Sequence, residues 1–187
     1  MVKIALLSVI SFVIMFIEFP LPLFPPFLKI DLSDIGALVG AFAFGPLAGM
    51  AVELLKNILH LMRTSTGGVG ELANFIVGAA LVVPAGFIYK RNKSMKTALI
   101  GLAVGTITMG LVGAFANYYI LIPFYENFMP IDQIIGMAQA ANSLIVDLNS
   151  YILYAVIPFN ILKGIVVSVL TLLIYKRISP LLHNTNQ

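Results

Sequence analysis

The stretch from Thr97 to Tyr125, TALIGLAVGTITMGLVGAFANYYILIPFY, contains no charged side chain and decides the class of fold. A helix crosses the apolar core of a bilayer with about 20 mostly apolar residues, so this stretch is long enough for one span. The whole chain shares this character, since 60% of its 187 residues are hydrophobic and only 10% are charged. Soluble domains carry about 25% charged residues, so a water-soluble enzyme is nearly excluded. The composition indicates a membrane protein with several spans.

Six helices account for the apolar runs of the chain. We expect a single all-α membrane domain over residues 1–187, a six-transmembrane-helix bundle with spans at about 4–19, 32–45, 47–63, 71–89, 97–119 and 150–175. Gly45-Pro46 sets the turn between the second and third helices, because Pro cannot continue a helix. Residues 20–33 contain four prolines and predict a stiff, apolar, non-helical loop. A short surface helix is expected between Asp132 and Leu144.

The charged residues outside these helices divide by the side of the membrane on which each connection would lie. One side carries seven basic residues and no acidic one: Lys3, Lys90, Arg91, Lys93, Lys96, Lys176 and Arg177. The other side carries two basic and seven acidic residues: Lys29, Arg63, Glu18, Asp31, Asp34, Glu71, Glu126, Asp132 and Asp147. Basic residues accumulate in cytoplasmic loops, so both termini are predicted to be cytoplasmic.

Three charged residues remain within the helices, where each needs a partner, a ligand or water. Two of them lie on the third helix, where Glu53, Lys56, Asn57 and His60 share one face through their i, i+3, i+4, i+7 spacing. We expect Glu53 and Lys56 to neutralise each other, either as a structural ion pair or as the polar wall of a binding cavity. His60 is expected near the membrane interface.

The third charged residue, Lys163, follows Asn160 and Pro158 on the sixth helix. Lys163 would lie about 15–20 Å deep at 1.5 Å per residue, and its own helix offers no nearby acid. It therefore needs a polar ligand or a partner on another helix. Pro158 also frees the carbonyl of Tyr154 from the helical ladder. Together with Asn117 at the outer end of the fifth helix, these side chains are suited to bind one flat polar heterocycle.

Several kinds of chemistry have no support in the sequence. The chain has no Cys, which excludes disulfides and thiolate metal sites. It contains no Walker A motif, no catalytic Ser/His/Asp set and no second buried His. We therefore expect no ATPase or other enzymatic activity, no metal, no bound cofactor and no nucleic-acid partner.

Five stretches, taken in order, carry a family resemblance: residues 18–22 (EFPLP) running into 29–34 (KIDLSD), 53–57 (ELLKN), 70–75 (GELANF), 117–119 (NYY) with Pro123 and Tyr125, and 157–164 (IPFNILKG). Over nearly its full length the chain resembles the substrate-binding (S) component of energy-coupling factor (ECF) vitamin transporters, specifically the riboflavin-binding kind. The resemblance implies the same six-helix bundle and a riboflavin site that opens to the outside.

The resemblance also implies roles for individual residues. Asn117, Asn160 and Lys163 would hydrogen-bond the flavin. The first outer loop would roof the site, with Leu21, Leu23 and Phe24 covering the ring system. Lys56 and Asn57 match the family pattern and are kept as candidate binding residues.

The implied partners are riboflavin or a related flavin, a membrane scaffold subunit and two cytoplasmic ATPases, in a bacterial cell membrane. The scaffold would dock on the small residues Ala5, Ser8 and Val9 of the first helix, where Val9 replaces the second Ala of the usual Ala-x-x-x-Ala. The transported ligand would be captured with high affinity. Three alternatives remain: an S component for another vitamin such as thiamine or pantothenate, a stand-alone proton-coupled carrier using Glu53 and Lys56, and a disfavoured membrane enzyme.

Overall fold

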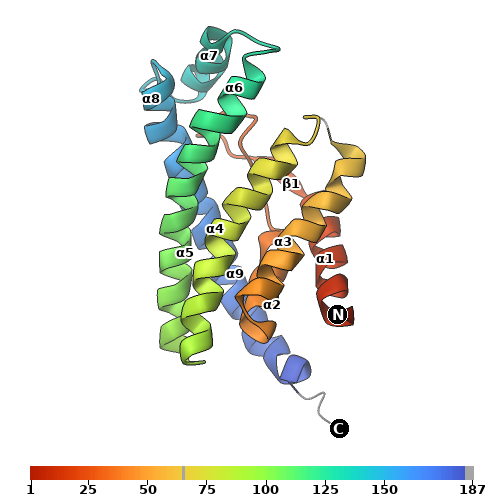
Figure 1. Cartoon of the computed structure of the whole chain (residues 1–187). Helices are drawn as coiled ribbons and strands as arrows, with labels where there is room; N and C mark the ends of the chain where they lie inside the picture. The colour runs from red at the N-terminus through yellow and green to blue at the C-terminus, as the bar shows by residue number, and fades with distance from the viewer. Residues whose placement is uncertain (65, 184–187) are drawn as a thin grey trace.

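A computed structural model describes residues 1–64 and 66–183, with side chains described as far as Tyr175, so the side chains of Lys176 and Arg177 lie outside the described part. This described part of the chain is a helical bundle with one small hairpin (Figure 1). Its elements are α1 (Val2–Met15), β1 (Glu18–Pro20), β2 (Lys29–Asp31), α2 (Asp34–Phe44), α3 (Pro46–His60), η1 (Leu61–Arg63), α4 (Val69–Arg91), α5 (Met95–Ala116), η2 (Asn117–Leu121), α6 (Ile122–Tyr125), α7 (Ile131–Ala141), α8 (Leu148–Tyr151), η3 (Ile152–Val156) and α9 (Ile157–His183).

A helix lies over most of each of the six ranges that the sequence indicates, but the first helix ends at Met15 instead of about residue 19, because the chain enters β1 at Glu18. The predicted turn at Gly45-Pro46 is confirmed: Gly45 ends α2 with φ of 100°, and Pro46 begins α3. Only glycine adopts this backbone conformation readily. The short helix predicted between Asp132 and Leu144 is also confirmed, as α7, although it begins at Ile131 and ends at Ala141. Among the described residues, three helices are long and apolar enough to cross a bilayer: Val69–Arg91, Met95–Tyr125 and Leu148–Tyr175.

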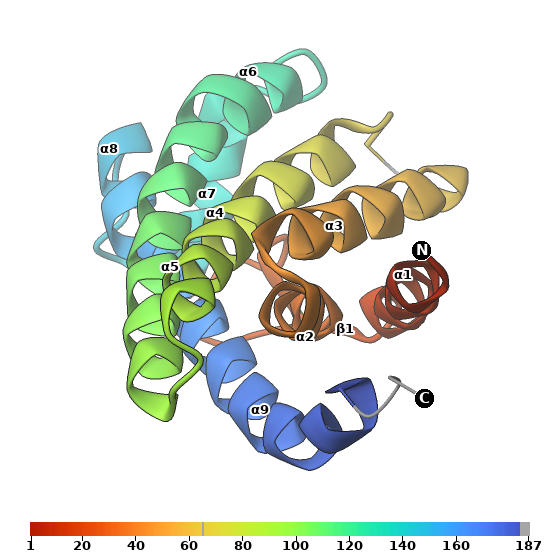
Figure 2. The ribbon, with the colours of Figure 1, turned by 60° about the horizontal axis from the view of Figure 1, so that its bottom comes forward.

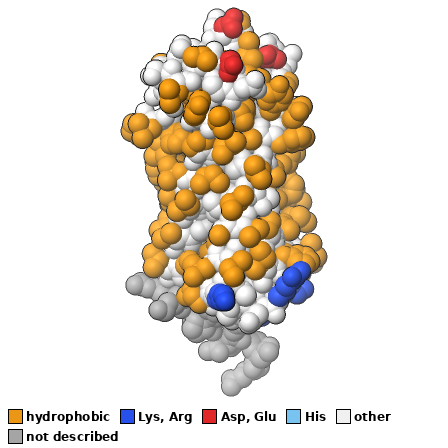
Figure 3. Space-filling view, turned by 90° about the vertical axis from the view of Figure 1, so that its left-hand side faces the viewer, with side chains coloured by type: hydrophobic (Ala, Val, Ile, Leu, Met, Phe, Trp, Pro, Cys, Tyr) orange, Lys and Arg blue, Asp and Glu red, His pale blue; other side chains and the backbone are white. Residues whose placement is uncertain are grey.

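The apolar flank of the bundle fits a lipid environment. Ile107, Leu111 and Phe115 follow one another at every fourth position of α5 and are 58–63% exposed. Large exposed apolar surfaces mark contact with a membrane or a partner. Figure 3 shows such side chains over one whole flank, between acidic side chains at one end and basic side chains at the other.

Helix α2 is the centre of the bundle, which explains why it is apolar on every face. It contacts α1, α3, α4 and α9, and Figure 2 shows it ringed by these helices. Leu38 of α2, Val52 of α3, Leu81 of α4 and Met109 of α5 are fully buried in this core. A second, smaller core around Ile134 of α7 lies at the end opposite the N-terminus (Figure 1).

The proline-rich segment is non-helical, as expected, but it also contains strands that the sequence did not predict. β1 and β2 pair antiparallel, with Glu18 opposite Asp31 and Pro20 opposite Lys29. The strands are only three residues long, too short for an alternating pattern to stand out among the prolines. The pairing of the strands makes the segment a hairpin, whose loop, residues 21–28, lies at the end of the bundle.

Two π-helical segments interrupt the long helices, and each lies before a proline. η2 precedes Pro123 and η3 precedes Pro158. A proline lacks the N–H that would bond the carbonyl four residues earlier, and that residue lies inside the π segment in both cases, at Tyr119 and Tyr154. The expected disturbance of the helical ladder at Tyr154 is therefore present. Such π turns are often found at functional sites.

Candidate ligand-binding site

The polar face of α3 is buried inside the bundle. Glu53 and Lys56 are fully buried, and Asn57 is nearly so. Lys56 Nζ lies 2.9 Å from a carboxylate oxygen of Glu53, which confirms the ion pair expected within this helix. Lys56 also donates to Ser33 Oγ at 2.7 Å and forms an ion pair with Asp34. This lysine therefore ties α3 to the start of α2.

Lys163 has protein partners that the sequence did not reveal. Its Nζ lies 2.7 Å from Asp31 Oδ2 and 3.2 Å from Asp34 Oδ2. Sequence order had placed both acids in the outer connection, but the structure buries Asp31 at 6% exposure and Asp34 completely. Neither acid is therefore a solvated surface charge, because the hairpin turns the chain inward before α2 begins.

The two lysines and three acids form one buried ionic network. Its members are Asp31 from β2, Asp34 from α2, Glu53 and Lys56 from α3, and Lys163 from α9. Charges taken out of water are tolerated only when they are paired and hydrogen-bonded. The network meets this need by joining the hairpin and three helices at one point.

Asn117 and Asn160 lie on the two helices that flank this region. Each is 6% exposed, and each side-chain amide donates to a carbonyl of the preceding turn, at Gly113 and Val156 respectively, at 2.9 Å. Gly113 leaves room for Asn160, since a Cβ on this glycine would lie 2.7 Å from Asn160 Nδ2. Both amides are thus held in fixed orientations on facing helices.

The sequence interpretation missed Tyr151. Its hydroxyl donates to Asn117 Oδ1 at 3.3 Å, and its side chain is almost fully buried. This bond fixes which way the Asn117 amide faces. A tyrosine near the end of an apolar run is typical of an ordinary interfacial anchor, so no local pattern in the sequence indicated this contact.

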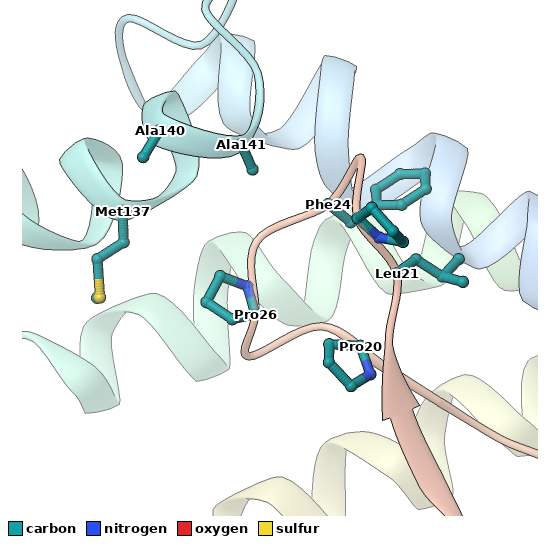
Figure 4. Close-up of a pocket in the computed structure, with 8 residues that line it drawn as sticks. Pro20, Leu21, Phe24, Pro26, Met137, Ala140 and Ala141 are labelled. Atoms are coloured by element: carbon teal, nitrogen blue, oxygen red, sulfur yellow. The ribbon is translucent and has the colours of Figure 1, made fainter.

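The hairpin loop borders an open cavity of about 520 Å³ at the end of the bundle. Figure 4 shows that loop residues form one wall and that α7 forms the other, and the lining residues are Pro20, Leu21, Pro22, Phe24, Pro26, Met137, Ala140 and Ala141. Pockets for small molecules are about 300–1,000 Å³ and mostly apolar. The cavity therefore suits the apolar part of a small ligand. The three residues of α7 were not among the expected site residues.

The structure separates the three predicted loop residues. Leu21 and Phe24 line the cavity, whereas Leu23 is 76% exposed and is not among the lining residues. The Phe24 ring meets the ring of Phe159 edge-on, with centroids 5.5 Å apart. Phe159 directly precedes Asn160, so the loop lies next to the polar stretch of α9.

A second polar cluster joins α3 to α4. Glu71 Oε1 lies 2.9 Å from His60 Nδ1, and its Oε2 accepts a hydrogen bond from the Thr64 hydroxyl at 2.8 Å. Glu71 is 6% exposed, so it too is buried within the bundle. This cluster closes the α3–α4 connection rather than contributing to the network around Lys163.

The predicted docking residues of α1 divide between two faces. Ala5 is exposed and Val9 is 49% exposed, so both are available at the bundle surface. Ser8 is buried, and its hydroxyl donates to the Ile4 carbonyl at 2.9 Å. Only Ala5 and Val9 therefore lie where another helix would reach them.

Comparisons with known proteins agree on one family. The family model described as "ECF transporter, substrate-specific component" matches residues 1–175. The chain is 41% identical over 182 residues to "Riboflavin transporter RibU" of Staphylococcus aureus (strain TCH60), covering 97% of this chain and 91% of that protein. It is 36% identical over 183 residues to "Riboflavin transporter FmnP" of Bacillus subtilis (strain 168), covering 96% and 92%. A solved structure described as "Structure and mechanism of the S component of a bacterial ECF transporter" matches with a TM-score of 0.77 and 38% identity, covering 98% of this chain and 96% of the other.

Proposed function

The chain belongs to the family of substrate-specific components of ECF transporters, and we propose that it is the membrane subunit that captures riboflavin for such a transporter. The observation that carries this proposal is the match over nearly the full chain, at 41% and 36% identity, to two riboflavin transporters. This family consists of transporter components, so the chain itself is assigned no catalytic reaction.

The candidate site has the chemistry that a flavin needs. The isoalloxazine ring is flat, with an apolar end and an opposite end that carries carbonyl and imide groups. The apolar cavity between the hairpin loop and α7 suits the first end. The amides of Asn117 and Asn160 and the ammonium of Lys163 suit the second, because a charged donor makes a stronger hydrogen bond to a carbonyl than a neutral donor does.

The proposed topology has six spans and cytoplasmic termini. Its support is the excess of basic residues on one side, seven against two, and the rule that basic residues stay in the cytoplasm. In this arrangement the hairpin and α7 face the outside, where the vitamin would enter. The chain would reside in a bacterial cell membrane.

The proposed partners supply the energy. Because the chain has no ATP-binding motif, ATP would be hydrolysed by two cytoplasmic ATPase subunits, and a membrane scaffold subunit would connect them to this chain. The exposed face of α1 that contains Ala5 and Val9 is the proposed docking surface for the scaffold.

The test is direct binding by the purified full-length protein in detergent. We expect flavin absorbance to co-purify, and riboflavin added to ligand-free protein to lose fluorescence with a submicromolar Kd. A vitamin competition series with thiamine and pantothenate separates riboflavin from other substrates. A protein that binds no riboflavin but binds another vitamin would overturn the substrate. Riboflavin uptake into liposomes by this chain alone, driven by a pH gradient, would overturn the dependence on ATPases.

A further inference from the structure

The hairpin touches α9 at two positions on the same helical face. Phe24 contacts Phe159, and Asp31 forms an ion pair with Lys163 at 2.7 Å. Phe159 and Lys163 are four residues apart and therefore lie on one face of the helix. The loop and the base of the hairpin thus both contact the part of α9 that carries the proposed binding residues.

Asp31 is held rigidly at the base of this hairpin. Its Oδ1 accepts hydrogen bonds from the backbone N–H of Ser33, at 3.0 Å, and from the Ser33 hydroxyl. Its Oδ2 accepts a hydrogen bond from the ammonium of Lys163. Both oxygens are therefore occupied by different partners, and the carboxylate can change neither its position nor its lysine without breaking one of these bonds.

Lys163 has one donor more than these acids use. An ammonium carries three N–H donors, of which at most two serve the acids: Asp31 Oδ2 accepts one at 2.7 Å, and Asp34 Oδ2 lies 3.2 Å away in an ion pair. The third is available to a ligand carbonyl. The Lys163 ammonium on α9 would then bind both the ligand and Asp31 of the hairpin.

We propose that Asp31 is a positioning residue that orients Lys163 for the ligand and latches the hairpin onto α9. The inference rests on the proposed function for the identity of the ligand, riboflavin, but the latch itself is a property of the protein alone. Release of the ligand would require the Asp31–Lys163 ion pair to break, so this pair would set the dwell time of the bound vitamin.

The experiment measures hairpin mobility and ligand release in the same set of variants. Because the chain contains no Cys, Leu23→Cys places one spin label at an exposed position of the loop. In this background we compare Asp31→Asn, Asp31→Glu, Lys163→Gln and the double variant Asp31→Asn/Lys163→Gln. Glu18→Gln is the matched control, since it removes the exposed ion pair with Lys29 in the same hairpin.

A latch predicts a mobile label in Asp31→Asn and in Lys163→Gln, with no further gain in the double variant. It also predicts riboflavin release at least about tenfold faster in Asp31→Asn, since breaking a buried pair is strongly unfavourable. Asp31→Glu keeps the carboxylate and should therefore show smaller increases in label mobility and in riboflavin release. Glu18→Gln should change neither quantity.

A label that stays immobile in Asp31→Asn, or that is equally mobile in Glu18→Gln, overturns the proposal. If Asp31→Asn does not yield a monodisperse protein, the comparison of Lys163→Gln with Glu18→Gln decides the same question. Label mobility is recorded without ligand, so it tests the latch even if the unmodified protein binds no riboflavin. In that case the proposed function fails and the latch is judged separately.

Discussion

Lys56 and Lys29 both form ion pairs, but their surroundings give the two pairs very different weight. Lys56 and its partners Asp34 and Glu53 are fully buried. Replacing Lys56 by Met would leave two buried carboxylates without their shared cation. Removing one partner of a buried pair costs about 3–5 kcal/mol. We therefore expect Lys56→Met to lower the thermal unfolding midpoint of the detergent-solubilised protein strongly.

The control for this prediction is Lys29→Met. Its ion pair with Glu18 is nearly half exposed, at 43% and 46%, and exposed pairs contribute about 0–1 kcal/mol. The midpoint should hardly change. Equal losses in the two variants would show that the buried network does not stabilise the bundle.

Lys163 differs from Lys56 in that its remaining donor is proposed to serve the ligand. We expect Lys163→Ala to weaken riboflavin binding by about tenfold or more, because a hydrogen bond to a charged group is worth about 1.5–3 kcal/mol. Fluorescence titration of the purified variant measures this. Lys96→Ala, in the exposed first turn of α5, is the control with the same substitution. Unchanged affinity in Lys163→Ala would remove this residue from the site.

At the scale of the elements, a glycine allows α4 and α5 to pack closely against each other. A Cβ on Gly105 of α5 would lie 2.4 Å from the Leu81 carbonyl oxygen of α4. Since that oxygen belongs to the backbone, a whole helix would have to move to admit a methyl group. Overpacking of this kind costs about 1–3 kcal/mol, and we expect Gly105→Ala to lower the unfolding midpoint accordingly.

Gly136→Ala is the matched control for this contact. Gly136 lies within α7, and nothing is found within 4 Å of a Cβ built there. Glycine in a helix is less favourable than alanine by about 0.5–1 kcal/mol, so this variant should be neutral or slightly more stable. A Gly105→Ala protein as stable as Gly136→Ala would mean that α4 and α5 can separate without cost.

Among the elements, helices and turns with local sequence signals could be predicted, whereas contacts between distant segments could not. Apolar runs and the Gly45-Pro46 turn were enough to place the helices, because both signals are local. Pro158 likewise predicted a disturbance around Tyr154, although not its π-helical form. The partner of Lys163 could not be predicted, since Asp31 lies 132 residues away and only the folded hairpin brings it inside.

At the scale of the whole molecule, the burial of three acids changes how the charges are interpreted. Asp31, Asp34 and Glu71 lie in the outer half by sequence order but are buried, so they say little about which side faces the cytoplasm. The orientation therefore depends on the basic residues alone. The positive-inside rule is itself a rule about Lys and Arg rather than about net charge, so the proposed topology survives the loss of these acids.

This topology can be tested with single cysteines, because the chain has none of its own. Asn127 follows α6 and Asn92 precedes α5, both are exposed, and one long helical stretch separates them. A membrane-impermeant maleimide should label Asn127→Cys in intact cells and should label Asn92→Cys only after permeabilisation. Val2→Cys should behave like Asn92→Cys, since an even number of proposed spans separates the two positions. Labelling of Asn92→Cys from outside would invert the orientation, and opposite results for Asn92→Cys and Val2→Cys would overturn the count of six spans.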